Sequence, residues 1–147
     1  MPANPNNASL DIARSFFTAY AQHDISRMLE AFSEDAELRY PPLGPQGEGR
    51  ARDLGKQIWT DLIDTFPDLH VKVQSMFGDE GNVAAEVLIG GTQSKDFHDI
   101  HNQGRHYEVP IAFLLRIDKG LIAEIAAYWD NMSFYSQLGK EVVGKAA

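Results

Sequence analysis

The spacing of apolar residues changes at Pro67, and this change is the feature that most constrains the fold. Before Pro67, apolar side chains recur every three or four residues, as they do in helices. After Pro67, apolar and polar residues alternate, which is typical of strands with one wet face. Helices first and strands afterwards predict an α+β fold, with three N-terminal helices packed on a curved antiparallel sheet.

Three segments before Pro67 have helical spacing. The first begins at Ser9, the second follows Asp24, and both residues are favoured N-caps. The third runs over residues 50–66 and ends at Pro67, which cannot continue a helix. Residues 1–8 are rich in Pro, Asn and Ala, so we expect a disordered arm there. A single domain over residues 9–140 and a flexible tail over 141–147 complete the expected organisation.

The last two expected strands, residues 105–118 and 121–130, form a hairpin around Lys119-Gly120. A regular ladder from this turn pairs Ile111 with Tyr128 and Val109 with Asp130. The face that holds Asp130 is the richer in branched and aromatic side chains, so we assign it to the interior. A one-residue slip would move Asp130 to the other face.

A carboxylate at the end of an interior face would have its pKa raised by desolvation, as a general acid or base near neutrality requires. Asp130 is therefore the first catalytic candidate, and an N-cap of the following helix is a compatible alternative. Glu124 is either a second pocket carboxylate or the partner of Arg39 or Arg116. His106 is the second catalytic candidate, as a proton partner near the pocket mouth.

Several aromatic residues belong either to the core or to the wall of a cavity. These are Tyr20, Tyr40, Trp59, Tyr107 and Tyr128. His98, His101 and His106 match no standard zinc spacing, so we expect no metal site. The glycines of "IGGTQ" (residues 89–93) indicate a bend in a strand, and the polar segment 94–104 is predicted to be a loop in the place of a lid.

Composition narrows the classes of partner. The formal net charge is −8, which disfavours nucleic acid and anionic membranes and favours a small ligand or a protein partner. The chain has no cysteine, which excludes disulfides and thiolate chemistry and fits a cytoplasmic location. We expect no signal peptide and no membrane span, because no segment approaches about 18 apolar residues.

Four stretches together resemble the SnoaL-like polyketide cyclases, within the superfamily of nuclear transport factor 2 and ketosteroid isomerase. They are "AYAQHDISRMLEAFSEDAELR" (19–39), "VAAEVLIGGTQ" (83–93), "FLLRIDKGLIAEIAAYWD" (113–130) and "DNMSFYSQLG" (130–139). The resemblance covers roughly residues 9–140. Two positions depart from the family pattern, with Gln93 in place of a histidine and Phe113 in place of a polar residue.

This resemblance implies a cone-shaped barrel with an apolar pocket and a homodimer formed through the outer face of the sheet. It also implies chemistry without metal or cofactor, in which Asp130 is the acid/base of an intramolecular aldol closure. Tyrosines or His106 would then steady the enolate oxygen. Phe113 would contribute an apolar wall to the substrate pocket.

Two hypotheses of different class remain open. The first is a cofactor-independent enzyme acting on a small apolar carbonyl compound, by cyclisation or by related isomerisation or dehydration. An epoxide hydrolase ranks low, because no Asp–Arg–Asp set can be placed on one face. The second is a non-catalytic module that binds a small molecule, because a fold does not fix a function.

Overall fold

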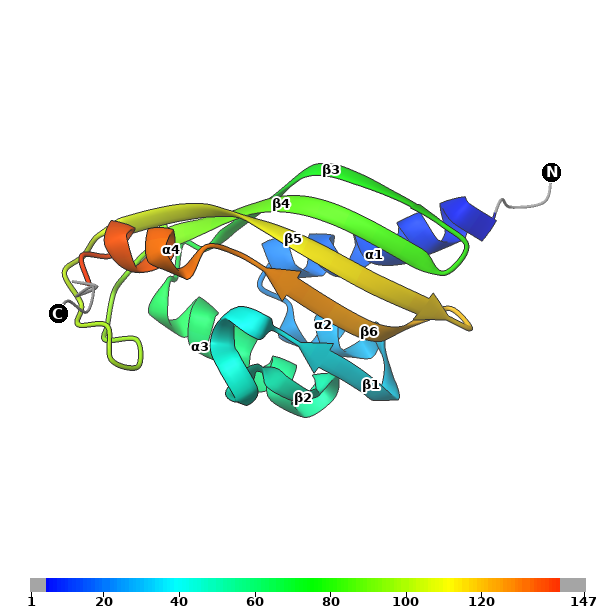
Figure 1. The fold of residues 1–147 in the computed structure, drawn as a ribbon, viewed down its shortest axis with the longest axis horizontal. Helices are drawn as coiled ribbons and strands as arrows, with labels where there is room; N and C mark the ends of the chain where they lie inside the picture. Colours follow the sequence, from blue (N-terminus) through cyan, green and yellow to red (C-terminus); the bar gives the residue numbers. More distant parts are fainter. Residues whose placement is uncertain (1–4, 141–147) are drawn as a thin grey trace, which may run out of the picture.

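The computed structural model describes residues 5–140 of the chain, and four helices and six strands in this range form one curved sheet with a helical layer (Figure 1). The helices are α1 (Pro5–Ala21), α2 (Ile25–Glu30), α3 (Lys56–Thr65) and α4 (Asn131–Gln137). The strands are β1 (Phe32–Arg39), β2 (Glu48–Arg50), β3 (His70–Asp79), β4 (Asn82–Thr92), β5 (His106–Asp118) and β6 (Leu121–Tyr128). A 3-10 segment, Pro41–Gly47, and a π turn, Ala51–Gly55, flank β2.

The six strands lie in the order β2-β1-β6-β5-β4-β3. Helices α1, α2 and α3 cover one face of this sheet, and α4 lies at one end of β5 (Figure 1). The predicted α+β class is confirmed. One detail differs from the expected antiparallel sheet, since β1 runs parallel to β6. No helix within residues 5–140 is long and apolar enough to cross a membrane.

The first helix begins at Pro5, so residues 5–8 are helical rather than part of an arm. Proline is tolerated in the first turn of a helix, where its missing N–H would have no partner. The predicted cap of α2 is present, because Asp24 accepts a hydrogen bond from the Arg27 N–H at 3.1 Å. Residues 1–4 and the expected tail at 141–147 lie outside the described residues.

A cluster of aromatic rings joins the helices to β1. Trp59 of α3 is fully buried, and its indole stacks on Phe32 with ring centroids 5.8 Å apart. Phe16 and Tyr20 of α1 approach the same indole at 5.6 and 6.1 Å. Gly55 allows this packing, since a Cβ at this position would lie 2.6 Å from the indole ring. Of the two positions that the sequence left open for Trp59, the structure has the core. Trp59 does not line the pocket described below.

The hairpin of β5 and β6 contains a bulge that the regular ladder did not anticipate. Ile117 pairs with Ile122 as expected, but Arg116 pairs with Glu124, which leaves Ala123 as an extra residue in β6. Every later pair is shifted by one position, so Tyr128 lies opposite Ala112 rather than Ile111. A one-residue shift exchanges the two faces of a strand. The face assigned to β6 from the sequence is therefore wrong, whereas the face assigned to the interior in β5 is buried as expected.

The shift turns Asp130 away from the interior and brings Trp129 inward. Asp130 is exposed, and its carboxylate accepts hydrogen bonds from the backbone N–H groups of Met132 at 2.9 Å and Ser133 at 3.3 Å. These bonds make it the N-cap of α4, the alternative that the sequence left open. The interior position expected for Asp130 is wrong, and its catalytic role remains a prediction without that support.

Replacing Trp59 with alanine should lower the free energy of unfolding by about 3–5 kcal/mol, because the cavity would lie among three other rings. Chemical denaturation followed by circular dichroism measures the change. Met132→Ala is the matched control, since this side chain is 57% exposed, and its effect should stay within about 0.5 kcal/mol. Equal effects of the two variants would contradict the role given to Trp59.

Replacing Asp130 with alanine should lower the free energy of unfolding by about 1 kcal/mol, because two backbone N–H groups of α4 lose their acceptor. Asp130→Asn should retain most of the stability, since asparagine caps helices as well as aspartate does. Thermal unfolding of both variants tests this prediction. A loss of equal size in Asp130→Asn would show that the negative charge, and not the cap, matters.

Candidate functional site

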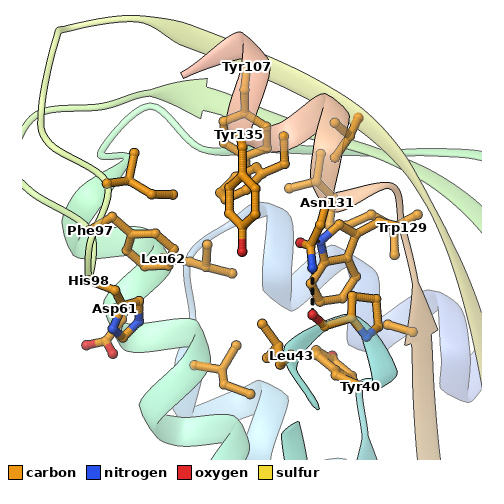
Figure 2. Close-up of a pocket in the computed structure, with 18 of the residues that line it drawn as sticks. Tyr40, Leu43, Asp61, Leu62, Phe97, His98, Tyr107, Trp129, Asn131 and Tyr135 are labelled. Carbon is orange, nitrogen blue, oxygen red and sulfur yellow. Dashed lines mark hydrogen bonds between the residues drawn. The ribbon is translucent and has the colours of Figure 1, made fainter. Parts of the chain in front are cut away.

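A pocket of about 450 Å³ opens between the helical layer and the sheet. Its walls come from the end of α1, the 3-10 segment, α3, the inner faces of β4–β6, α4 and the loop that follows β4. Figure 2 shows these elements surrounding the space, with aromatic side chains on several sides. The volume lies in the range of small-molecule sites.

The structure brings four of the predicted substrate-binding residues into this pocket and leaves the others outside. Tyr20, Tyr40, Tyr107 and Phe113 line it. The predicted pocket positions of Tyr128 and Glu124 are wrong, because the bulge in β6 turns both to the outer face of the sheet. There Tyr128 accepts a hydrogen bond from Arg39 at 2.8 Å, and Glu124 lies 3.8 Å from Arg116 in one of the two ion pairs left open by the sequence.

Three tyrosines of the pocket wall are almost fully enclosed by the protein. Burial raises the pKa of Tyr20, Tyr40 and Tyr107 far above the ordinary value, and the charge of Tyr20 would further raise the other two. These hydroxyls therefore stay protonated. The Tyr40 hydroxyl itself is not open to the pocket, and the polar group beside it is the buried indole N–H of Trp59.

One wall of the pocket is fixed by hydrogen bonds that use up its polar atoms. The indole N–H of Trp129 donates to the Asn131 side chain at 2.8 Å, and Asn131 in turn donates to the Pro42 carbonyl at 2.6 Å. Figure 2 shows the second of these bonds. This wall therefore presents mainly the aromatic ring of Trp129 to the pocket. The rings of Tyr40 and Trp129 pack edge to face, with their centroids 5.7 Å apart. Tyr135 of α4 directs its hydroxyl into the space (Figure 2).

The carboxylates and the imidazole that line the pocket lie at its mouth. They are Asp61 of α3 and the neighbouring pair His98 and Asp99. His98 and Asp99 form the turn of a small hairpin in which Phe97 and Ile100 exchange two backbone hydrogen bonds of 3.0 and 2.9 Å. All three titratable residues are exposed. This hairpin occupies the lid position expected for the segment 94–104.

Gln93 holds the lid in place through hydrogen bonds. It is 2% exposed, and its amide donates to the Ile100 carbonyl at 3.0 Å, while its backbone N–H donates to Arg105 at 2.9 Å. Gln93 does not line the pocket. At the position where the resemblance leads one to expect a histidine, this chain therefore has a residue that holds the loop.

His106, the second catalytic candidate, lies away from the pocket. Its ring Nδ1 is 2.9 Å from the Thr92 hydroxyl, which donates to Asp68 at 2.8 Å, and its ring stacks on His70. The Thr92 backbone N–H lowers the pKa of Asp68 by donating to it. The expected position of His106 near the mouth is wrong, because the inward residue of this pair in β5 is Tyr107.

The sequence analysis missed Asp61, His98, Trp129, Asn131 and Tyr135. Asp61 could have been found, since it follows Ile58 by three residues on α3 and so shares a helix face with a pocket residue. The other four residues reach the pocket because of the bulge in β6 or the path of the lid. Neither feature can be recognised from the residues nearby in the sequence. In the range 5–140, no group of three or more His, Asp or Glu side chains is arranged to hold a metal ion.

Known proteins with the same fold were found among solved structures. A proposed SnoaL-like polyketide cyclase from Jannaschia sp. CCS1 superposes with a TM-score of 0.81 at 16% identity, over 97% of this chain and 99% of that one. IdmH, a proposed polyketide cyclase from Streptomyces antibioticus, gives 0.77 at 24% identity, over 89% and 98%. AclR, a proposed hydroxylase from Streptomyces galilaeus, gives 0.79 at 19% identity, over 91% and 97%. These likenesses show the fold.

No curated protein matches the sequence of this chain. The family model of the SnoaL-like polyketide cyclases does match, over residues 10–138. This range includes the helical layer, the whole sheet and α4, and thus every element that lines the pocket. The chain belongs to the SnoaL-like polyketide cyclase family.

Proposed function

We propose that this protein binds a small, largely apolar carbonyl compound of polyketide type in its pocket and catalyses enolisation followed by intramolecular aldol closure, without metal or cofactor. Membership of the family supports a ligand of this class. The aromatic walls and the volume of about 450 Å³ suit a molecule of two or three fused rings. We also propose that the protein acts in the cytoplasm.

The observation that carries this proposal is the hydroxyl of Tyr135, which α4 directs into the aromatic pocket (Figure 2). A ligand carbonyl oxygen in the pocket could accept a hydrogen bond from this hydroxyl. The same donor would bind an enolate oxygen more strongly than a neutral carbonyl, because the bond then becomes charge-assisted.

The space around this hydroxyl therefore suits the oxygen on which negative charge develops. Tyr20 and Tyr107 also line the pocket, and burial keeps their hydroxyls protonated. Preorganised donors in a site that excludes water stabilise such an oxyanion. The proton acceptor must come from elsewhere, since these tyrosines hold their own protons too firmly to act as bases.

Tyr135→Phe should slow enolisation about 100-fold, because it removes one donor to the developing oxyanion. The probe is a bicyclic aromatic β-keto ester, and the readout is exchange of its α-hydrogen for deuterium in D2O. Binding of the probe, followed by tryptophan fluorescence, should weaken only about threefold to tenfold. Tyr128→Phe is the matched control, since it removes a hydroxyl on the outer face.

The non-catalytic alternative makes a different prediction for the same experiment. If the wild-type protein binds the probe and does not accelerate exchange, the pocket is a binding site only and the enzymatic proposal fails. If the wild type accelerates exchange and Tyr135→Phe matches it, the enzymatic proposal stands but Tyr135 is not the donor.

We further propose that two copies of the chain associate through the outer face of the sheet. Apolar side chains surround the exposed Glu86 there in an outer patch made up of Ala84, Leu88, Pro110, Ala112, Leu114 and Tyr128. Leu114 is 48% exposed in this patch, next to the Arg116–Glu124 pair at its border. A stable dimer needs about 800 Å² of such surface on each partner.

Leu114→Glu should convert a dimer into a monomer, because it removes an exposed apolar side chain of the outer patch and adds a second negative charge to that of Glu86. Sedimentation velocity at several concentrations measures the mass. Ala21→Glu, an exposed position of α1 in the helical layer, is the control and should remain dimeric. A monomeric wild-type protein would refute this arrangement.

A further inference from the structure

The pocket separates hydrogen-bond donors from groups that can accept a proton, and this separation raises the question of which group is the base. Three tyrosines of the wall, Tyr20, Tyr40 and Tyr107, are buried, and burial raises their pKa values. Among the described residues that line the pocket, the carboxylates and imidazole are Asp61, Asp99 and His98, all at the mouth. If the proposed function holds, the base is one of these three.

We infer that His98 is the acid/base group of this pocket and that Asp61 supports it by stabilising its protonated form. This inference rests on the proposed function and names the residue that moves the proton. A neutral imidazole is the side chain best suited to take and return a proton near neutral pH.

Asp99 is poorly suited to the same role. Its carboxylate lies 2.7 Å from the ammonium of Lys140, and this hydrogen bond lowers the pKa of Asp99. A carboxylate with a lowered pKa is a weaker base. The pair instead ties the hairpin to the end of the described chain, where Lys140 also lies 4.5 Å from the ring centre of Tyr135.

The backbone of His98 is that of a tight turn. His98 has a φ of 55°, in the left-handed region, as do His23 and Lys119 at two other turns of the chain. The conformation alone therefore assigns no function, and the contacts that hold the hairpin carry the argument.

The surroundings fix the hairpin from both sides. Gln93 holds the Ile100 carbonyl from beneath, and the Asp99–Lys140 pair holds the turn from the other side. The ring of Phe97 packs edge to face against Phe66 of the core at 5.7 Å. The His98 ring is therefore carried by an anchored turn rather than by a free loop, as positioning of a proton acceptor requires.

Asp61 is the charged group available to support a protonated His98. It is exposed on α3 and forms no ion pair or hydrogen bond with another described residue, whereas Asp64, one turn later, lies 3.8 Å from Lys95. Figure 2 draws Asp61 and His98 at the same side of the pocket, where α3 meets the lid. The charged groups around His98 are thus Asp61 from α3 and, within the hairpin, Asp99 with its partner Lys140.

The proposed step balances without a further reactant. The imidazole of His98 takes a proton from the carbon next to a carbonyl, and the electrons of that C–H bond form an enolate whose oxygen lies among the tyrosine hydroxyls. The enolate carbon attacks a second carbonyl carbon of the same molecule, which forms a C–C bond and an alkoxide. The alkoxide takes the proton from the imidazolium, so the cyclic product is an isomer of the substrate.

The test uses deuterium exchange into the β-keto ester probe together with its binding constant. His98→Gln should slow exchange at least about 100-fold while the dissociation constant stays within about twofold. The increase in exchange rate with pH, which reflects loss of the imidazole proton, should also disappear. His101→Gln is the matched control, since His101 lies three residues along the same loop, pairs with Asp96 and does not line the pocket.

The role of Asp61 has its own readout. Asp61→Asn should slow exchange less than His98→Gln does, and Asp61→Glu should restore the rate, because a carboxylate would stabilise the imidazolium as it forms. Asp64→Asn, on the same helix and outside the pocket, should leave the rate unchanged. An equal loss in Asp61→Asn and Asp61→Glu would show that Asp61 acts only on structure.

The outcomes separate this inference from the proposed function. If wild type accelerates exchange and His98→Gln retains the full rate, His98 is not the base and the inference is overturned, while the proposed function stands. If Asp130→Asn abolishes exchange instead, the base is Asp130. If wild type binds the probe without accelerating exchange, the proposed function and the inference fail together.

Discussion

The packing of Trp59 is the interaction on which the rest of the structure depends. Its indole contacts rings from α1 and β1 and holds α3 against them, so it joins helices and sheet at one point. The π turn that ends at Gly55 lets the ring approach the backbone, which a Cβ would prevent. Because α3 is fixed in this way, its next turn presents Leu62 and Asp61 to the pocket. The position of the mouth thus follows from a contact in the core.

A second constraint is the extra residue in β6. Ala123 has no partner in β5, and every side chain after it exchanges faces relative to a regular ladder. The bulge therefore gives the pocket the ring of Trp129 and gives the outer face the hydroxyl of Tyr128. It also leaves Asp130 at the point where the chain leaves the sheet, with its carboxylate directed to the first N–H groups of α4.

Together these constraints produce a pocket with two chemically different ends. Burial keeps the hydroxyls of Tyr20 and Tyr107 protonated in the enclosed part of the wall. Solvent reaches the mouth, where carboxylates and an imidazole can keep their charge at little cost. Such an arrangement suits a molecule whose carbonyl oxygen enters first and whose reactive carbon remains within reach of the mouth.

The sequence by itself determined the elements and their class. Helical spacing up to Pro67, alternation after it, and the caps at Asp24 and Asp130 are local properties, and local sequence is sufficient to set them. Tyr20 and Tyr40 were found in this way as pocket residues. Only the tertiary structure decided which side chains face the cavity, because one extra residue at Ala123 reverses the faces of β6 without any change in its apolar pattern. The lid that carries His98 is likewise set by contacts from distant segments, which no spacing along the chain encodes.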